Sequence, residues 1–316
     1  MGLRWPATLG LWLLRRSRSR LGLALGYHRV GDPQGDPSRE LVPALASERF
    51  ASQLAHLRRH YRLVPASELH EAVRARRRGQ PFPVAVTFDD DLSSHARVAM
   101  PLLRQAGIPA TFFVCGASLG GPYSFWWERL QRALDHGSLN AAERGALIGI
   151  GGGSSIHEVA GAIQQLAPEE RDEVARRLGE VVGPDPGESG LRAKDLRILV
   201  EAGFEVGFHT LRHDDLRALD DVALDAALTE GRSAIEDVTG KRPDLIAYPH
   251  GSADVREAAA ARAAGYVGGF TMKTEAVGPA TDPLLMGRVE PGYGSTSRFA
   301  LELVLLLLRG ALKREP

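Results

Sequence analysis

Short apolar runs alternate with longer amphipathic stretches through most of this 316-residue chain. The apolar runs cover residues 21–26, 84–88, 110–114, 205–208, 245–248 and 266–270. Runs of this length are typical of parallel strands that are buried on both faces. Their alternation with helices predicts an α/β domain, built either as an open doubly wound sheet or as a closed barrel.

The amphipathic stretches have the features of helices. Residues 47–60 place Phe50, Leu54 and Leu57 on one face, as a helix packed on a core does. Four other stretches end on a glycine that we expect in the left-handed conformation of a helix C-terminus: Gly107, Gly203, Gly240 and Gly265.

Residues from about 119 to 190 interrupt the alternation and are rich in Ala, Glu and Arg, with a glycine-rich break at 151–155. We predict a mostly helical insertion there, with no chemistry visible in its second half. The expected organisation is a basic, apolar leader at 1–20, an α/β domain at 21–295 that contains the insertion, and an apolar helix at 296–316.

Both ends of the chain combine apolar and basic residues. The first 31 residues contain six arginines and no acidic residue, and residues 299–308 are apolar except for Glu302. A secretory signal carries its charge before its apolar run, whereas most of the charge here follows the run. We therefore expect no cleavable signal, and a cytoplasmic or membrane-associated protein. The two ends could lie on an anionic membrane surface, or they could pack on the domain.

The composition excludes several classes of protein. The 39 basic and 39 acidic residues give zero net charge, which argues against a nucleic-acid binder. The single cysteine, Cys115, cannot form an internal disulfide, and we expect it to be a small buried side chain. No apolar run reaches the ~18 residues that a membrane-spanning helix needs.

Ionisable residues gather where the predicted strands end. His28, the run from Asp89 to Asp91, His209 and His250 each follow an apolar run. The carboxyl ends of parallel strands share one edge of a barrel or sheet, and sites are built at that edge. Three adjacent carboxylates in an apolar setting need a cation or a proton, although a helix cap is the alternative explanation.

His209 and His213 are four residues apart, so both rings can reach one ion from a single helical turn. Two histidines with one carboxylate, and with the remaining positions open, are typical of a catalytic zinc or similar site. The histidine pair alone is a weak signal, and it becomes strong together with the aspartates.

Three further features have two readings each. The turn at Tyr248-Pro249-His250-Gly251 could aim a backbone N–H at an oxyanion, or it is an ordinary loop. Trp126 and Trp127 could stack on a sugar ring, or they pack in the core. His28 is either a hydrogen-bonded structural residue or a catalytic one.

Three segments together resemble the motifs of the NodB-homology polysaccharide deacetylases (carbohydrate esterase family 4). They are Thr87-Phe88-Asp89-Asp90, His209-Thr210-x-x-His213 and Tyr248-Pro249-x-Gly251, supported by residues 27–30 and 107–114. The resemblance implies a distorted (β/α) barrel with fewer than eight complete units. It also implies a metal-dependent hydrolase that removes N-acetyl groups from an N-acetylated polysaccharide or glycolipid in envelope or exopolysaccharide metabolism.

The resemblance also implies roles for individual residues. Asp89 would be the general base that takes a proton from metal-bound water, and the backbone N–H of His250 would help to hold the oxyanion. The residues that would bind a divalent ion, zinc first and Co²⁺, Mn²⁺ or Ni²⁺ as alternatives, are Asp90, His209 and His213. Apart from the resemblance, the residues that we expect to contact the glycan are Tyr248 and Pro249 of the turn and, if they stack on a sugar ring, Trp126 and Trp127.

The sequence departs from the family's pattern at several points. Ala247 stands where an arginine normally orients the base, and we expect Arg288 to replace that arginine from another strand. The family's late general-acid histidine has no counterpart, and we expect His28 to act in its place, with Asp89 in a double role as the alternative. Asp91 replaces the usual glycine and is expected to add charge beside the base.

Two other functions stay open at this point. Another hydrolase of linear amides on the same scaffold, such as a deformylase, would release formate in place of acetate. A metal-binding or glycan-binding protein whose catalysis has decayed would be unaffected by replacement of Asp89.

Overall fold

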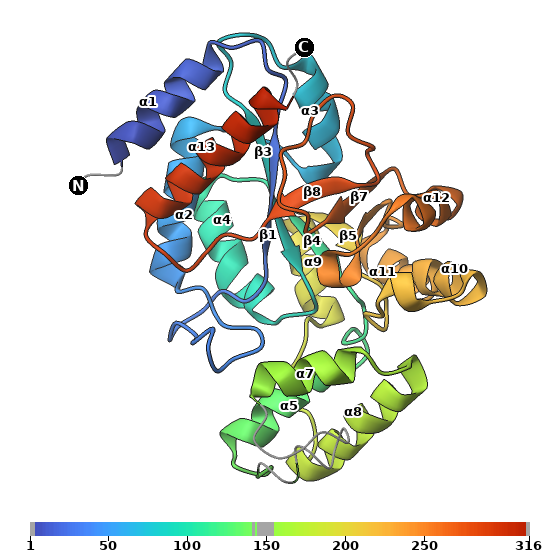
Figure 1. Cartoon of the computed structure of the whole chain (residues 1–316). Coiled ribbons are helices and arrows are strands. Elements are labelled where there is room, and N and C mark those ends of the chain that lie inside the picture. The colour runs from blue at the N-terminus through green and yellow to red at the C-terminus, as the bar shows by residue number, and fades with distance from the viewer. Residues whose placement is uncertain (1–3, 141–142, 144–154, 314–316) are drawn as a thin grey trace.

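The structure is a computed structural model of the chain, and it describes residues 4–140, 143 and 155–313. At its centre lies a closed barrel of parallel strands (Figure 1). The seven barrel strands are β1 (Leu23–Tyr27), β3 (Pro83–Asp89), β4 (Thr111–Val114), β5 (Glu205–Phe208), β6 (Leu245–Ala247), β7 (Gly268–Thr271) and β8 (Met286–Val289). Because β1 pairs with both β3 and β8, the sheet closes on itself. The distorted (β/α) barrel expected from the sequence is confirmed.

Two strands were not expected from the sequence. β2 (Arg62–Leu63) is only two residues long and pairs with the start of β3. β8 contains a glycine and an arginine, and therefore lacks the apolar run by which the other strands were recognised.

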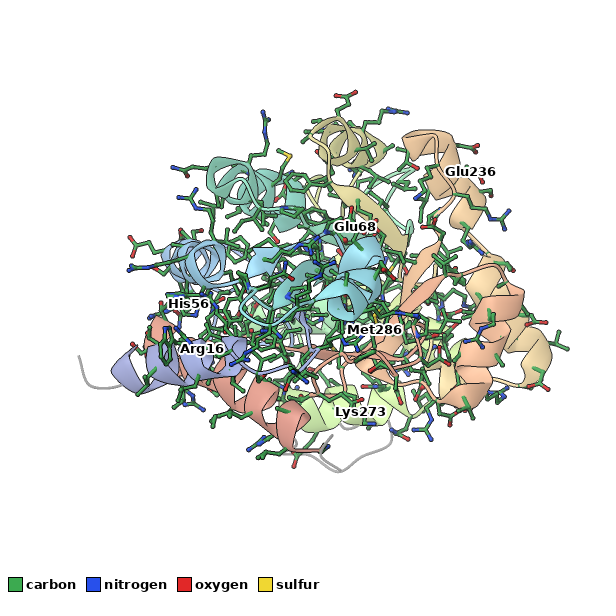
Figure 2. All side chains as sticks on the ribbon, turned by 90° about the horizontal axis from the view of Figure 1, so that it is seen from above. Arg16, His56, Glu68, Glu236, Lys273 and Met286 are labelled. Atoms are coloured by element: carbon green, nitrogen blue, oxygen red, sulfur yellow. The ribbon has the colours of Figure 1, made fainter. Side chains whose placement is uncertain are left out.

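Helices surround the barrel (Figure 1, Figure 2). They are α2 (Ser47–His60), α3 (Leu69–Ala75), α4 (Met100–Ala106), α9 (Ala193–Glu201), α10 (Asp221–Thr229), α11 (Arg232–Thr239) and α12 (Val255–Ala263). Short turns of helix connect them: η1 (Ala66–Glu68), the π-helical η2 (His95–Ala99), η3 (Leu216–Ala218) and η4 (Pro249–Gly251). The glycines expected in the left-handed conformation all have it, with φ of 63° at Gly107, 84° at Gly203, 74° at Gly240 and 87° at Gly265.

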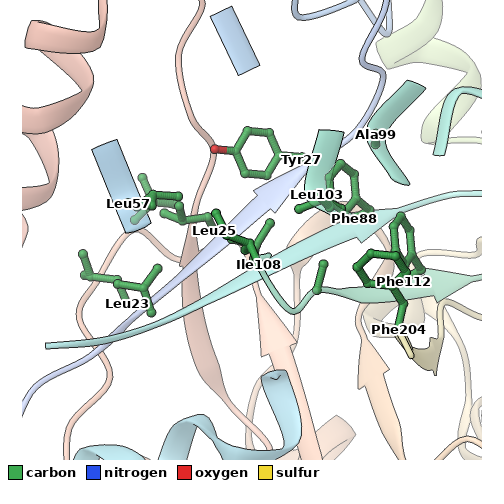
Figure 3. Close-up of a cluster of buried hydrophobic side chains, with 14 of the residues drawn as sticks. Leu23, Leu25, Tyr27, Leu57, Phe88, Ala99, Leu103, Ile108, Phe112 and Phe204 are labelled. Carbon is green, nitrogen blue, oxygen red and sulfur yellow. The ribbon is translucent and has the colours of Figure 1, made fainter. Parts of the chain in front are cut away.

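The main core fills the space between the strands and the helices that cover them. Every residue of β3 is buried, as expected for a strand covered on both faces. Figure 3 shows Leu25, Phe88 and Phe112 of the strands beside Leu57 of α2 and Leu103 of α4. The rings of Phe88 and Phe112 stack with their centroids 4.8 Å apart. This core holds the strand ends, and therefore the site, in place.

Three helices extend beyond the barrel at the bottom of Figure 1: α5 (Trp126–Asp135), α7 (Ile156–Gln164) and α8 (Pro168–Val182). Their facing sides form a small core of their own around Leu130, Val159 and Leu178. The expected helical insertion is therefore present in the described residues. Residues 151–154 of the expected glycine-rich break lie outside them.

The two ends of the chain lie side by side (Figure 1). Helix α1 (Arg4–Arg15) packs on α13 (Thr296–Leu312), and Leu11 and Leu14 of α1 are buried. No helix in the described part of the chain is long and apolar enough to cross a membrane. The division of the chain at residues 20 and 296 stays a prediction.

Candidate metal centre and active site

One pocket collects the side chains that follow the barrel strands. Its volume is about 770 Å³, within the range of small-molecule sites. The residues singled out in the sequence that line it are His28, Asp89, Asp90, Trp126, Trp127, His209, His213 and His250. The carboxyl ends of β1, β3, β5 and β6 thus meet at one site, as parallel strands require.

Asp90, His209 and His213 form a buried group of possible metal ligands. Asp90 Oδ1 lies 3.6 Å from Nε2 of His209 and 3.6 Å from Nε2 of His213. One ligand atom of each residue lies within 4.8 Å of those of the other two. Asp90 and His213 have positive φ of 74° and 53°, a strained conformation that tends to occur at functional sites.

The hydrogen bonding of this group fits a cation. His209 Nδ1 lies 2.8 Å from the carbonyl oxygen of Ala247, which can only accept a hydrogen bond, so Nδ1 carries the proton. The lone pair of Nε2 then faces Asp90 Oδ1, a buried oxygen without a hydrogen-bond partner among the described residues. Two acceptors that face each other in this way are satisfied by an ion between them. A carboxylate and two imidazoles suit zinc or a similar divalent ion, and a carbonyl that accepts from the other ring nitrogen commonly orients such a histidine.

Burial favours the neutral form of each of these three side chains and shifts its pKa accordingly. It raises the pKa of Asp90 to about 7, an effect that His28 opposes and Asp89 reinforces. It lowers the pKa of His209 to about 4 and holds the pKa of His213 well below its usual range. Because neutral imidazole is the form that binds metals, both histidines are ready to bind at neutral pH.

Asp89 is bound by Arg288 through two parallel hydrogen bonds. The guanidinium nitrogens of Arg288 donate to Oδ1 and Oδ2 of Asp89 at 2.6 Å each, and both residues are buried. Arg288 also donates to Thr87 Oγ1 at 3.1 Å. Burial alone would raise the pKa of Asp89, but Arg288 and, next, His209 outweigh it and hold this pKa well below its usual range. Asp89 is therefore ionised and fixed in orientation, and its catalytic role stays a prediction.

His250 and His28 approach the group from two other strand ends. His250 lies in η4 with a positive φ of 57°, so the backbone turns sharply after β6, and its ring is 4.6 Å from the ring of His213. His28 is partly exposed, with Nδ1 3.9 Å from Oε1 of Glu290. The expected roles of both residues stay predictions.

The two tryptophans have different surroundings. Trp127 is almost buried, stacks on Phe125 with the ring centroids 4.4 Å apart, and contacts the ring of His213 at 4.8 Å. Trp126 is half-buried and lines the pocket. Trp126 is therefore the better placed of the two to meet a sugar ring, while Trp127 supports a possible ligand.

The structure corrects two expectations. Tyr248 and Pro249 are buried and do not line the pocket, and the Tyr248 hydroxyl donates to the carbonyl of Leu284 at 2.9 Å. The prediction that these two side chains contact substrate is therefore wrong, because they pack under the turn.

Asp91 also differs from its expected role. Its carboxylate accepts hydrogen bonds from the backbone N–H groups of Cys115, Gly116 and Ser118, and from the Ser118 hydroxyl. It therefore ties the loop after β3 to the loop after β4. It caps no helix in the described part of the chain, and its charge contributes to the raised pKa of Asp90. Cys115 itself is buried, as expected.

Several residues of the site were missed in the sequence. Glu290 follows β8, which was not recognised as a strand. Arg171 of α8 is buried and donates to Asp214, the residue after His213. Ala160 and Gln164 of α7 line the pocket. No local pattern in the sequence links these residues to the strand ends, which is why the second half of the insertion showed no chemistry there.

Comparisons with known proteins agree with this architecture. No curated protein matches the chain. Among solved structures, the chain is similar to the Streptococcus pyogenes deacetylase PplD, at 15% identity and a TM-score of 0.60, over 91% of this chain and 98% of that one. It is similar to IcaB from Ammonifex degensii, at 20% identity and a TM-score of 0.56, over 90% and 98%. It is also similar to a de-N-acetylase from Aggregatibacter actinomycetemcomitans, at 16% identity and a TM-score of 0.58, over 88% and 99%.

At these identities the similar structures establish the fold alone. A model of the family described as polysaccharide deacetylase matches residues 76–144 and 170–269, which together make up more than half of the chain. The match includes both histidines and both aspartates of the candidate site. The chain belongs to the polysaccharide deacetylase family.

Proposed function

We propose that this protein is a metal-dependent hydrolase that removes N-acetyl groups from an N-acetylated polysaccharide or glycolipid. The observation that carries the proposal is the buried group of Asp90, His209 and His213 beside an ionised Asp89 in one pocket. Family membership supports hydrolysis of an amide bond. The similar structures described as deacetylases support the choice of acyl group.

Asp90, His209 and His213 would hold the metal ion, with zinc favoured by the donor set and Co²⁺, Mn²⁺ or Ni²⁺ as alternatives. When bound, such an ion supplies Lewis acidity toward a carbonyl oxygen and lowers the pKa of water.

Asp89 is the proposed general base. Its carboxylate accepts a proton from the water that adds to the acetamide carbonyl carbon, and the bidentate bond to Arg288 keeps one orientation for this transfer. Proton transfer of this kind contributes about 10²–10⁴-fold to a rate.

His250 and His28 are proposed to serve the two other needs of the reaction. The backbone N–H of His250, at the sharp turn after β6, donates to the oxyanion of the tetrahedral intermediate. His28 gives a proton to the leaving nitrogen, and its Nδ1 lies 3.9 Å from Oε1 of Glu290. The C–N bond then breaks, and acetate and a free amine result.

The pocket suits a sugar more than a small charged ligand. Trp126 offers an aromatic face at its wall, and Leu41, Val42 and Tyr293 add apolar surface. Apolar and aromatic walls with a few placed polar groups are usual for such sites. Envelope and exopolysaccharide glycans are the substrates we propose.

The test is acetate release from N-acetylated glucosamine oligosaccharides by zinc-loaded protein. We expect acetate from the wild type, and Asp89→Asn to lower kcat by about 10²–10⁴-fold. Asp225→Asn, an exposed aspartate on α10, is the matched control and is expected to keep the wild-type kcat. His28→Ala tests the general acid, and a wild-type kcat in that variant would remove His28 from the mechanism.

Two results would favour the other functions. Formate release from N-formylated sugars, without acetate release from N-acetylated ones, would identify a deformylase. No acyl release from any glycan, with glycan binding that Asp89→Asn leaves unchanged, would identify a protein whose catalysis has decayed.

A further inference from the structure

Helix α1 has apolar side chains on two faces. Its inner face packs on α13, where Leu11 and Leu14 are buried and where a Cβ on Gly10 would lie 3.1 Å from Val304. On its outer face, the exposed fraction of the residue is 59% for Leu9, 48% for Trp12 and 55% for Leu13. A helix on the surface of a soluble domain normally turns polar residues outward. The outer face of α1 is therefore expected to have an apolar contact of its own.

The exposed residues form one stripe that ends in a charge. The stripe starts at Leu9 and continues three, four and seven residues later, with Trp12, Leu13 and Arg16. This spacing places all four on one side of the helix. The Arg16 guanidinium lies 3.3 Å from the centroid of the Trp12 ring. Arg16 is exposed, and Figure 2 labels it beside α1. We call these four residues the α1 surface.

More arginines lie beside this end of α1. Arg78 Nε donates to the carbonyl of Arg16 at 2.7 Å, and the N–H of Gly79 donates to the carbonyl of Arg15 at 2.7 Å, which joins the two segments. The exposed members of this arginine cluster are Arg16, Arg18, Arg77 and Arg78. In the part of the chain that the structure describes, none of these four forms an ion pair with a carboxylate. The cluster therefore presents uncompensated positive charge.

The small apolar area of the α1 surface and the positive charge beside it favour a lipid bilayer over a protein as the partner. A stable protein interface needs about 20–30 residues on each side, whereas the apolar part of the α1 surface has three side chains. A short amphipathic helix with Trp and Leu on one side and arginines at its border is typical of a segment that lies in the headgroup region of a bilayer. Positive charge without counter-charge is attracted to anionic lipid.

We propose that the α1 surface docks the protein on an anionic lipid bilayer. Leu9, Trp12 and Leu13 enter the headgroup region, and the arginine cluster contacts lipid phosphates. The contact is peripheral, and it does not depend on the enzymatic activity of the protein.

Docking would bring the pocket close to the bilayer. Val304 of α13 receives α1, and the adjacent residues Leu305 and Leu306 line the pocket, with Leu305 40% exposed. Helix α13 thus lies between α1 and the pocket. Because a helix is about 10 Å wide, the pocket is close to the docking contact. If the proposed function holds, glycans carried by membrane lipids are the substrates that this arrangement favours.

The test is co-sedimentation of the full chain with two kinds of vesicle, phosphatidylcholine alone and phosphatidylcholine mixed with phosphatidylglycerol. We expect binding to the mixed vesicles that weakens with salt. Leu9→Ser/Leu13→Ser is expected to weaken it by at least about tenfold, because two exposed leucines are lost. Arg77→Gln/Arg78→Gln is expected to weaken it by about 25-fold, at about fivefold per arginine.

Matched controls replace exposed apolar side chains and exposed arginines on other helices of the domain. Val222→Ser/Val255→Ser replaces apolar side chains that are 81% and 77% exposed on α10 and α12. Arg104→Gln/Arg197→Gln replaces two exposed arginines on α4 and α9. Both controls are expected to bind mixed vesicles as the wild type does, and thermal unfolding checks that all variants are folded.

Two results would overturn the proposal. One is failure of the wild type to sediment with mixed vesicles, and the other is wild-type binding by both test variants. Analytical ultracentrifugation tests the main alternative, which is that the α1 surface forms a dimer interface. A dimer that Leu9→Ser/Leu13→Ser abolishes, without any vesicle binding, would show that a second copy of the chain covers the α1 surface.

Discussion

Asp89 is ionised although it is buried, because a second buried residue compensates its charge. The bidentate pair with Arg288 replaces the water that Asp89 loses on folding. A pair of this kind stabilises a fold only when both members are present, since either one alone leaves an unpaired charge in the interior. The orientation and the charge of the proposed base therefore depend on one residue of a distant strand.

Replacing Arg288 with methionine tests this dependence. Burial alone raises the pKa of Asp89, so without Arg288 the carboxyl should become protonated at a higher pH than in the wild type. A base that protonates at higher pH loses activity earlier as the pH falls, and the acid limb of kcat/KM should move upward. The free energy of unfolding should fall by about 3–5 kcal/mol. Arg288→Lys keeps the charge without the bidentate geometry, so its acid limb and its free energy of unfolding should lie between those of the wild type and Arg288→Met.

An exposed arginine provides the comparison for this variant. Arg298→Met on α13 should change neither the pH profile nor the unfolding midpoint, because the pair that Arg298 forms with Glu302 is exposed. If Arg288→Met keeps the wild-type acid limb, Arg288 does not act through Asp89.

Asp90 should release a proton when the metal binds. Its pKa of about 7 in the metal-free protein means that it is mostly protonated below neutral pH, whereas His209, with a pKa of about 4, is already neutral there. At about pH 6 we expect Asp90 to release close to one proton per metal ion, and by about pH 8.5 we expect almost no proton from Asp90. Zinc affinity should rise by about tenfold per pH unit up to neutrality.

Calorimetry in buffers with different heats of ionisation measures this proton release. A release near zero at both pH values would contradict the assignment of Asp90 as a protonated ligand. Release of two protons at the lower pH would instead mean that the histidines keep ordinary pKa values.

At the scale of elements, two helices of the insertion contact the proposed metal centre. Arg171 of α8 forms a buried ion pair with Asp214, which follows His213, and Trp127 of α5 packs on the His213 ring. His213 has a strained backbone, with φ of 53°, and follows the short loop after β5. The contacts from α5 and α8 therefore hold His213, a proposed ligand that lies outside the barrel strands.

We expect Arg171→Met to weaken zinc binding by about 10–100-fold, the usual effect of losing a contact behind a ligand. Arg171→Lys should restore part of the affinity, because it keeps the charge beside Asp214. Arg176→Met, an exposed arginine on the same helix, is the matched control and should bind zinc as the wild type does. A competition titration with a zinc chelator measures all four proteins. Equal affinity in Arg171→Met and the wild type would show that the insertion does not position His213.

At the scale of the whole molecule, the parts that could be predicted depend on local pattern. Six barrel strands carry apolar runs, and helix 47–60 has an apolar stripe, so their positions follow from periodicity. Parallel strands end at one edge, which is why His28, Asp89, His209 and His250 could be placed in one pocket before the fold was known.

The parts that could not be predicted depend on contacts between distant residues. Arg288 and Asp89 are 199 residues apart, and their contact was only a hypothesis until the fold placed β8 beside β1 and β1 beside β3. The pair of Arg171 and Asp214 has no local pattern at all. Tyr248 has a polar group at a strand end, as a substrate contact would, and only packing shows that its hydroxyl is used within the protein.

Metal content is the most direct test of the proposed site. Elemental mass spectrometry should find about one zinc per chain in wild-type protein after zinc loading and dialysis. His209→Ala and His213→Ala should each lose the metal. His250→Ala should keep it, because His250 contacts His213 without belonging to the ligand group. Wild-type protein without metal, or full metal content in His209→Ala, would contradict the account.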